Sequence, residues 1–309
     1  MCFKSMYRYT AFDEYIKEYI SADRVFSDEP MSRHTTFRVG GPADRFVEIS
    51  SVSELSAVVK YLHMTGNDFF VLGNGSNLLV SDSGYRGIIL HIGSGMGDIE
   101  ISGNTVRAGA GALLSTTAKK ACAEGLTGME FATGIPGSIG GAMVMNAGAY
   151  DGEMGMVTDR VKVATYDGEI LNLDNKSMDF KYRESSVKNR PYVVLEATFK
   201  LEQGDKDKID AKVKELDEKR RSKQPLDYPS AGSTFKRPEG HFAGKLIMDA
   251  GLRGFRVGGA QVSEKHCGFV INIGNATAAD IYELMQEVSE KVYDKFDVRL
   301  EPEVIRLGF

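Results

Sequence analysis

The stretch GIPGSIGGAMVMNAGAY, from Gly134 to Tyr150, has the composition of a ligand-binding loop around which the rest of the chain is organised. It contains five glycines, Gly134, Gly137, Gly140, Gly141 and Gly148, together with Pro136. Glycine permits sharp turns and a close approach of the backbone to a ligand, and proline fixes one φ angle. No side chain of the stretch is charged, so an anion would be met by backbone N–H groups. We predict a loop that holds a phosphorylated cofactor; a tight packing turn is the alternative.

A second glycine segment, LGNGSNLLVSD from Leu72 to Asp82, directly follows an expected strand at Phe69–Leu72. The carboxyl end of a strand is where α/β proteins tend to bind ligands. The segment lacks the third glycine of a Rossmann fingerprint, since Leu78 stands there and no helix pattern follows. No Walker sequence occurs in the chain. A nucleotide would therefore be held in another way, by the donors of Gly73, Asn74, Gly75, Ser76 and Asn77.

Composition bounds the possible partners. The chain has 309 residues, of which 42% are hydrophobic and 26% charged, and this suits a globular protein with two or three domains. The formal net charge of -5 argues against a nucleic-acid or anionic-membrane partner, because such binding needs a basic excess. No apolar run approaches the roughly 18 residues of a membrane span, and the first residues are too polar for a signal peptide. We expect a cytoplasmic protein with a small-molecule partner.

Cysteines and histidines give no sign of a metal centre or a disulfide framework. The three cysteines, Cys2, Cys122 and Cys267, are far apart and form no CxxC pair, as expected in a reducing compartment. The five histidines lack the spacing of metal-binding motifs. We therefore expect no bound metal.

Working outward, the local patterns predict alternating helices and strands. Residues 1–32 are typical of a mixed helical leader. Further on we expect helices at 53–64, capped by serine and Gly66, and at 113–124, and strands at 46–49, 69–72, 87–92 and 191–201. A hairpin is expected around the Asp167-Gly168 turn.

The C-terminal third begins with a charged helix at 205–224, which has a narrow apolar face and is typical of a solvated connection between domains. Its basic end offers Arg220 or Lys223 to a phosphate. Beyond it we expect a helix at 244–250, several strands, and a long amphipathic helix opened by Thr277 and Asp280 as a capping-box variant. The tail, VRLEPEVIRLGF, is predicted to be a short strand that carries Glu301 and Glu303.

Five motifs in order make a recognisable set. They are LGNGSNLLV at Leu72, GIPGSIGGAMVMNAGAY at Gly134, YRESSVK at Tyr182, AGSTFKRP at Ala231 and LEPEVIRLG at Leu300. From about Arg33 to the C-terminus, the chain closely resembles the UDP-N-acetylenolpyruvoylglucosamine reductase family of bacterial cell-wall flavoenzymes. The gap between the third and fourth motifs is similar to that of the family's shorter form, which lacks an inserted tyrosine-bearing loop.

The resemblance implies an α+β, non-Rossmann FAD-binding fold of the vanillyl-alcohol oxidase type. The FAD-binding domain would span 33–204, with subdomains at about 33–90 and 91–204. The charged helix at 205–224 would connect it to an α+β substrate domain at 225–309. We expect a monomer.

The same resemblance implies FAD and NADPH as cofactors, with FAD held by both glycine loops. The implied cofactor contacts are Leu72, Gly73, Asn74, Gly75, Ser76, Asn77, Leu78, Gly134, Ile135, Pro136, Gly137, Ser138, Gly140, Gly141, Asn146, Gly148, Ala149 and Tyr150, with Arg220 from the connecting helix. Candidate substrate contacts are Lys223, Lys236, Arg237, Lys245 and Arg253. Since Arg237 stands where many members have asparagine, the side chain that meets the uridine diphosphate stays open.

Three residues carry over as catalytic: Arg183, Ser233 and Glu303. Singly, they fit a surface ion pair, a turn or cap, and a solvated strand residue, and only their membership of the motif set favours catalysis. The implied reaction delivers hydride from FAD to the terminal carbon of the enolpyruvyl ether, so that negative charge develops beside the substrate carboxylate. Arg183 can pair with that charge in a bidentate manner. An ionised Glu303 would repel it, so we infer that Glu303 is protonated or held against Arg183.

The α-carbon then needs a proton, and Ser233 is the implied donor. A hydroxyl is a weak acid, but it suits an acceptor as basic as this carbanion. The substrate would be UDP-N-acetylglucosamine enolpyruvate and the product UDP-N-acetylmuramate. Two rival hypotheses are another FAD-dependent oxidoreductase of the same fold and a non-catalytic UDP-sugar-binding regulator.

Overall fold

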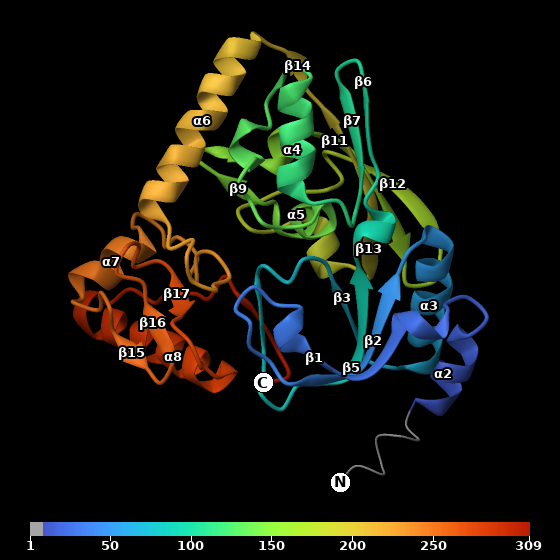
Figure 1. The fold of residues 1–309 in the computed structure, drawn as a ribbon, viewed down its shortest axis with the longest axis horizontal. Coiled ribbons are helices and arrows are strands. Elements are labelled where there is room, and N and C mark those ends of the chain that lie inside the picture. Colours follow the sequence, from blue (N-terminus) through green and yellow to red (C-terminus); the bar gives the residue numbers. More distant parts are fainter. Residues whose placement is uncertain (1–8) are drawn as a thin grey trace. The chain divides into compact units, whose positions relative to one another are not determined.

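The structure, a computed structural model, describes residues 9–309 of the chain. The first residues of the predicted leader, with Cys2, lie outside the described residues. The described chain forms two compact units, each assembled from separate segments. The first unit comprises residues 9–27, 44–74 and 87–218, and the second comprises 28–43, 75–86 and 219–309 (Figure 1).

A four-stranded sheet of strand order β1-β2-β5-β3 lies early in the chain. Its strands are β1 (Val25–Pro30), β2 (Pro42–Ile49), β5 (Tyr85–Ile92) and β3 (Phe69–Leu72), and β3 runs parallel to β5. Two helices, α2 (Thr10–Ile16) and α3 (Val52–Thr65), precede β1 and β3. The predicted caps of the second helix are confirmed: the Ser51 hydroxyl accepts a hydrogen bond from the Glu54 N–H, and Gly66 ends the helix in the left-handed conformation.

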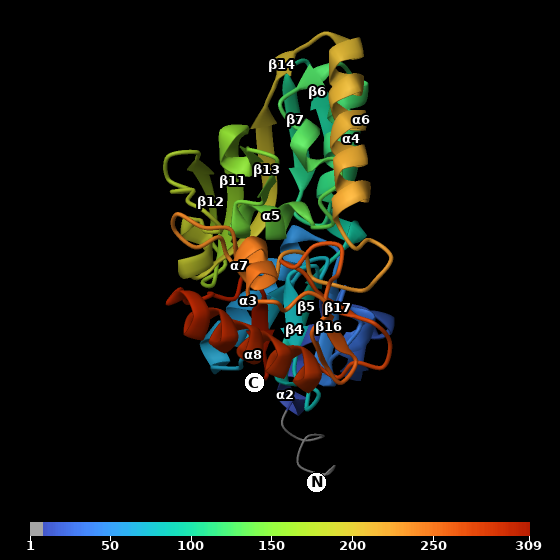
Figure 2. The ribbon, with the colours of Figure 1, turned by 90° about the vertical axis from the view of Figure 1, so that its left-hand side faces the viewer.

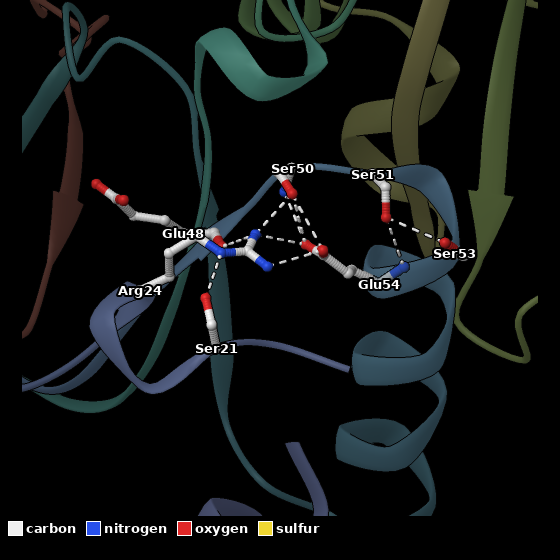
Figure 3. Close-up of polar contacts among 7 residues, drawn as sticks. All are labelled: Ser21, Arg24, Glu48, Ser50, Ser51, Ser53 and Glu54. Atoms are coloured by element: carbon white, nitrogen blue, oxygen red, sulfur yellow. Dashed lines mark hydrogen bonds and ion pairs between the residues drawn. The ribbon is translucent and has the colours of Figure 1, made fainter. Parts of the chain in front are cut away.

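The leader is helical only in part, because β1 occupies its last residues and pairs with β2. A short 3-10 turn, η1 (Ala22–Arg24), attaches it to α3 (Figure 3). The Arg24 guanidinium donates hydrogen bonds of 2.8 and 2.9 Å to the two carboxylate oxygens of Glu54. The Ser50 N–H donates to the same carboxylate at 2.9 Å. One carboxylate at the start of α3 therefore ties down both the leader and the end of β2.

A five-stranded antiparallel sheet, of order β12-β11-β13-β7-β6, forms the rest of the core of the first unit. The strands are β6 (Ile99–Ser102), β7 (Thr105–Gly109), β11 (Thr158–Thr165), β12 (Ile170–Asp174) and β13 (Tyr192–Lys200). The predicted hairpin is confirmed, since β11 and β12 pair on either side of the turn with Gly168 at φ 87°. The helix predicted at 113–124 is confirmed as α4 (Leu114–Ala123), which buries Leu114, Ala118 and Ala121 on one face.

The predicted loop Gly134–Tyr150 is corrected by the structure: it contains a short helix, α5 (Ile139–Met145), followed by the two-stranded β9 (Gly148–Ala149) and β10 (Gly152–Glu153). Glycines at 140 and 141 weaken helix propensity, so no helical pattern was recognisable in this stretch. The helix forms because Ser138 caps it and because it packs against β13.

The connecting helix α6 (Lys206–Lys223) buries Ile209 and Leu216, as its spacing predicts. Just before it in the chain, the short strand β14 (Glu202–Gln203) pairs with β8 (Leu126–Thr127).

The second unit is built around α8 (Ala278–Phe296), which packs against α7 (Ala243–Asp249) and against a small antiparallel sheet (Figure 2). That sheet consists of β15 (Arg256–Val257), β16 (Ala260–Val262) and β17 (Val270–Asn272). The predicted capping box of Thr277 and Asp280 is confirmed. The Asp82 carboxylate also accepts hydrogen bonds from the first two N–H groups of α8, at 2.8 and 2.9 Å.

The tail of the chain returns to the second glycine segment. Strand β18 (Ile305–Leu307) pairs in parallel with β4 (Leu78–Val80), in the register Ile305↔Leu78. The predicted tail strand is therefore shorter than expected, and Glu301 and Glu303 precede it. An apolar core shared by Phe37, Leu79, Phe235 and Ile281 holds these segments within the second unit.

Candidate functional site

The two predicted glycine loops touch within the first unit. The Asn74 side-chain amide donates a hydrogen bond to the Pro136 carbonyl at 2.5 Å. A Cβ atom built on Gly73 would lie 2.2 Å from the Ser138 hydroxyl oxygen, which is far inside van der Waals contact. Glycine at 73 is therefore required by the approach of the second loop.

The loop before α5 is held from behind by residues 110–114. The Leu114 N–H donates to the Gly137 carbonyl, while Ile139 and Gly140 donate to the carbonyls of Ala112 and Ala110, each at 2.8 Å. The carbonyls of Pro136 and Gly137 are thus turned toward the protein. A phosphate group would therefore meet the small residues of this loop and those of its N–H groups that these bonds do not use.

Several glycines of the motifs have a packing reason for lacking a side chain. A Cβ on Gly75, which has φ +59°, would lie 1.9 Å from the His34 carbonyl oxygen in the second unit. One on Gly148 would lie 2.6 Å from the Gly152 carbonyl oxygen. Gly141 differs, because the nearest heavy atom to its Cβ is the Ser138 hydroxyl at 3.5 Å. The packing alternative therefore explains glycine at 75 and 148, but it does not explain Gly141.

The remaining predicted cofactor residues lie on the same loops. Leu72 ends β3 and is buried, and Ile135 is half-buried on the loop before α5. Tyr150 and Asp151, at φ 51° and 66°, form the two-residue turn between β9 and β10, and Tyr150 is exposed there. Gly134 and Pro136 are exposed, whereas Leu78 is buried in β4 and Ser76 is half-buried.

Arg183 lies on a tight turn in the first unit. Lys181 and Glu184 exchange backbone hydrogen bonds of 2.9 and 3.1 Å, which leaves Tyr182 and Arg183 at the tip. Arg183 has a φ of 57°, an unfavourable region for a residue with a side chain. Its guanidinium donates to the Gly148 carbonyl at 3.1 Å and lies 5.2 Å from the centre of the Tyr182 ring. The turn thus presents a cation beside the segment that follows α5.

Ser233 and Glu303 lie on two segments of the second unit that form a short antiparallel pairing. The Glu303 N–H donates to the Thr234 carbonyl and the Lys236 N–H donates to the Glu301 carbonyl, both at 2.8 Å. Phe235 and Pro302 face each other between these two bonds. The pairing therefore sets the relative positions of residues 233 and 303 through the backbone, and both side chains are half-buried.

Thr234 is the residue that locks this pairing, and sequence analysis overlooked it. It is fully buried, its hydroxyl accepts a hydrogen bond from the Val270 N–H, and its own N–H donates to the Gly268 carbonyl, both at 2.8 Å. Its position directly after Ser233 in the motif was the available signal.

Asn77, predicted to contact the cofactor, makes two contacts with the Glu303 segment. Its side-chain amide donates to the Glu303 carbonyl at 3.1 Å, and its own carbonyl accepts a hydrogen bond from the Ile305 N–H at 3.0 Å. The end of the glycine segment and the catalytic candidate are therefore attached to each other within the second unit.

The predicted substrate cations lie in the second unit, where Lys236, Lys245 and Arg253 form polar contacts with protein groups. Lys236 forms an ion pair with Glu301 at 2.6 Å, and Lys245 forms one with Asp249 at 2.5 Å. Arg253 donates to the Glu264 carbonyl. Both lysine pairs are solvent-exposed and therefore contribute little to stability, so a stronger anion could displace them.

Arg237 stacks on the Phe242 ring, with its guanidinium carbon 4.0 Å from the ring centre. The two predicted residues at the end of α6 lie at its last turn, where Arg220 is half-buried and Lys223 is exposed. Burial, with a smaller contribution from the charge of Lys223, lowers the pKa of His266 below its usual value. A neutral imidazole therefore lies near this basic group at pH 7.

Burial raises the pKa of the Cys122 thiol to about 12, so this cysteine is inert at neutral pH. Among residues 9–309, no cluster of three or more metal-ligating side chains occurs. Within the same residues, no helix is both long and apolar enough to cross a membrane.

Comparison with known families covers both units. The family model described as FAD binding domain matches residues 43–174. The model described as UDP-N-acetylenolpyruvoylglucosamine reductase, C-terminal domain, matches residues 224–307. The connecting helix α6 lies between the two matched regions.

Similar proteins extend the match to nearly the whole chain. The UDP-N-acetylenolpyruvoylglucosamine reductase of Lachnoclostridium phytofermentans is 50% identical over 297 residues, which cover 95% of this chain and 96% of that protein. The Pediococcus pentosaceus protein of the same name is 51% identical over 296 residues, or 96% of this chain and 98% of its own length.

A solved structure agrees. The crystal structure of the Thermus caldophilus UDP-N-acetylenolpyruvylglucosamine reductase matches with a TM-score of 0.79 at 35% identity, and the match covers 90% of this chain and 97% of that one. The α+β FAD-binding fold expected from the motifs is confirmed. This chain therefore belongs to the UDP-N-acetylenolpyruvoylglucosamine reductase family.

Proposed function

We propose that this protein reduces UDP-N-acetylglucosamine enolpyruvate to UDP-N-acetylmuramate, with NADPH as reductant and FAD as bound cofactor. The observation that carries the proposal is the pairing of residues 233–236 with 301–303. The backbone of the segment that carries Ser233 is hydrogen-bonded to the segment that carries Glu303, within the part of the chain that matches the reductase family's C-terminal domain.

The residues of the first unit fit a flavin dinucleotide. The FAD-binding match includes both glycine loops, which touch through Gly73 and Ser138. Residues 72–81 and 134–150 of these loops bear no charged side chain, so backbone donors would meet the diphosphate. These loops would hold FAD, which would supply the hydride-transfer chemistry between NADPH and the substrate's double bond.

The protein's own groups would handle charge and proton. Arg183 is a permanent cation whose planar guanidinium can pair with the substrate carboxylate as negative charge develops beside it. The Ser233 hydroxyl would give its proton to the α-carbon and recover one from solvent. Glu303, whose N–H is bonded to the Thr234 carbonyl next to Ser233, would orient that hydroxyl. Lys223, Lys236, Arg237, Lys245 and Arg253 are proposed to meet the substrate's anionic groups.

We also propose that residues 33–204 act as the FAD-binding domain and 225–309 as the substrate domain. We propose a monomeric cytoplasmic enzyme whose product enters peptidoglycan synthesis and so serves cell shape and division.

A coupled assay tests the function. The purified protein is incubated with NADPH and UDP-N-acetylglucosamine enolpyruvate, and NADPH loss is followed together with the mass of the sugar nucleotide. The proposal expects stoichiometric NADPH consumption and a product about 2 Da heavier, since one hydride and one proton are added. NADPH oxidation that ignores the sugar would favour another oxidoreductase of this fold, and a protein without flavin would favour a binding regulator.

A further inference from the structure

Asn146 ends α5 in an unusual and completely buried position. Its backbone is left-handed, with φ 42° and ψ 57°, and none of its surface is exposed. Asparagine is the side-chain-bearing residue best suited to this conformation at a helix end. The conformation alone explains why asparagine is tolerated here, but it does not explain why the amide is buried.

The buried amide joins two separate segments of the first unit. Its oxygen accepts a hydrogen bond from the Gly155 N–H at 2.8 Å, and its nitrogen donates to the Lys181 carbonyl at 3.1 Å. The orientation of the amide is fixed, because a backbone N–H can only donate and a carbonyl can only accept. Both ends of the side chain therefore bind protein groups.

Lys181 is the first residue of the turn that carries Arg183. That turn has two further attachments to the same short segment: the Ser185 hydroxyl donates to the Val144 carbonyl, and Arg183 itself donates to the Gly148 carbonyl, each at 3.1 Å. Residues 144–148 thus hold the turn before, at and after its tip. Because the φ of 57° at Arg183 is unfavourable, the turn keeps its shape only if such contacts hold it.

We propose that Asn146 is a positioning residue, which fixes the direction of the Arg183 side chain by anchoring the Lys181 carbonyl. The sequence led us to expect a cofactor contact at Asn146, but both of its polar atoms are taken by backbone groups. The proposal rests on the proposed function only for the catalytic consequence. The anchoring itself is independent of any substrate.

The test compares Asn146→Asp with Asn175→Asp in the flavin-loaded protein. The first variant keeps an acceptor for the Gly155 N–H but turns a carboxylate oxygen toward the Lys181 carbonyl. Asn175 is a matched control, because its amide donates to the Gly155 carbonyl at 2.8 Å and to the Thr158 carbonyl at 2.7 Å. It thus contacts the same glycine from elsewhere and lacks the bond to Lys181.

Amide hydrogen exchange of the 181–186 segment gives the first readout, which needs no substrate. Exchange in this segment should rise about tenfold or more in Asn146→Asp, the effect expected when a buried hydrogen bond is lost. It should stay at the wild-type rate in Asn175→Asp. Unchanged exchange in Asn146→Asp would overturn the anchoring.

Anaerobic half-reactions give the second readout. In Asn146→Asp, reoxidation of the flavin by the enolpyruvyl sugar nucleotide should slow by about 10- to 100-fold, the effect of a misplaced catalytic group. Reduction by NADPH and affinity for FAD should stay within about threefold of wild type, because Asn146 acts on the Arg183 turn and not on the cofactor. A threefold change is smaller than the tenfold change that corresponds to about 1.4 kcal/mol. A matching loss in both half-reactions, or weakened FAD binding, would overturn the positioning role and favour a direct cofactor contact.

Two further outcomes remain decisive. If Asn146→Asp does not fold, Ser185→Ala removes the second attachment of the same turn, and it should give the same selective slowing with a smaller amplitude. An equal slowing of both half-reactions by Ser185→Ala would overturn the proposal. If the wild-type flavin is not reoxidised by the sugar, the proposed function fails, and hydrogen exchange alone then confirms or overturns the anchoring by Asn146.

Discussion

Replacement of Gly73 by alanine tests the contact between the two glycine loops. The φ angle of Gly73 lies outside the left-handed region, so alanine meets no backbone penalty, and any effect comes from its Cβ. That atom would lie 2.2 Å from the Ser138 hydroxyl oxygen, whereas real Cβ atoms essentially never approach within 3.0 Å. The loops must therefore separate by at least 0.8 Å, the difference between these two distances, or Ser138 must change rotamer.

Neither response is free of cost. Ser138 is 3% exposed, and its hydroxyl accepts a hydrogen bond from the Gly141 N–H as the cap of α5. Loss of such a cap costs about 1 kcal/mol, and overpacking a tight site costs about 1–3 kcal/mol. We expect Gly73→Ala to lower the free energy of unfolding by about 1–3 kcal/mol, which corresponds to a Tm lower by roughly 2–8 °C. FAD affinity should fall by tenfold or more, on the order of 1.4 kcal/mol.

Calorimetry at saturating FAD and a fluorescence titration with FAD measure the two effects. Gly141→Ala is the informative partner, because its Cβ meets only the Ser138 hydroxyl, at 3.5 Å. Alanine in the first turn of α5 should leave Tm unchanged or raise it slightly. A loss of FAD by Gly141→Ala without a loss of stability would then report contact with the cofactor. A Gly73→Ala protein with wild-type Tm and wild-type FAD affinity would refute the tight-contact reasoning.

Three further predictions use other parts of the chain. Ser233→Ala should slow flavin reoxidation by substrate by about 10²-fold or more while flavin reduction by NADPH is retained; equal slowing in stopped-flow traces would exclude a proton donor. Asn77→Ala leaves the Glu303 carbonyl without its donor and should lower kcat with little change in KM for NADPH, whereas a rise in that KM alone would contradict the account. Glu54→Gln breaks the paired carboxylate held by Arg24 and should cost about 1.5–3 kcal/mol at pH 7, measured by urea unfolding. Burial raises the pKa of Glu54, but the hydrogen bonds from Arg24 and Ser50 outweigh it and the net pKa is lowered. This stabilisation is therefore complete above the unfolded pKa and is lost as the pH falls through the folded one, so the wild-type advantage over Glu54→Gln should shrink below about pH 4.5. An advantage that stays constant down to pH 3 would contradict the assignment.

The elements that could be predicted from sequence are those that local chemistry determines. Helix α3 has a serine before it, a glycine after it and four apolar residues on one face, and the structure confirms all three features. Helix α8 has its capping box at Thr277. The β11–β12 hairpin follows from its Asp-Gly turn. In each case the deciding contacts lie within a few residues of one another.

The features that could not be predicted depend on distant partners. Helix α5 contains two glycines and forms because Ser138 caps it and β13 supports it. Segment 75–86 joins the second unit because β4 pairs with β18 and because Asp82 caps α8, and segment 28–43 joins it through Phe37, whose carbonyl accepts a hydrogen bond from the Asn272 amide. The residue pattern of neither segment predicts a contact with residues more than 190 positions away.

In the candidate site, too, some features could be predicted from the sequence and others could not. Motif order alone selected Arg183, Ser233 and Glu303, because residue types in a known order identify a reaction. The backbone pairing of the Ser233 segment with the Glu303 segment, and the buried Asn146 behind the Arg183 turn, were visible only in three dimensions. Hydrogen bonds to main-chain atoms leave little trace in sequence patterns, since any residue supplies a carbonyl or an N–H.

Anaerobic stopped-flow spectroscopy of the flavin tests whether this protein transfers hydride from NADPH to the enolpyruvyl sugar nucleotide. The purified protein is mixed first with NADPH and then with UDP-N-acetylglucosamine enolpyruvate, while the flavin absorbance is recorded. The account predicts bleaching by NADPH and full recovery of colour with the sugar nucleotide. Bleaching without recovery would contradict the assigned substrate, and a protein that cannot take up FAD would contradict the function given to both glycine loops.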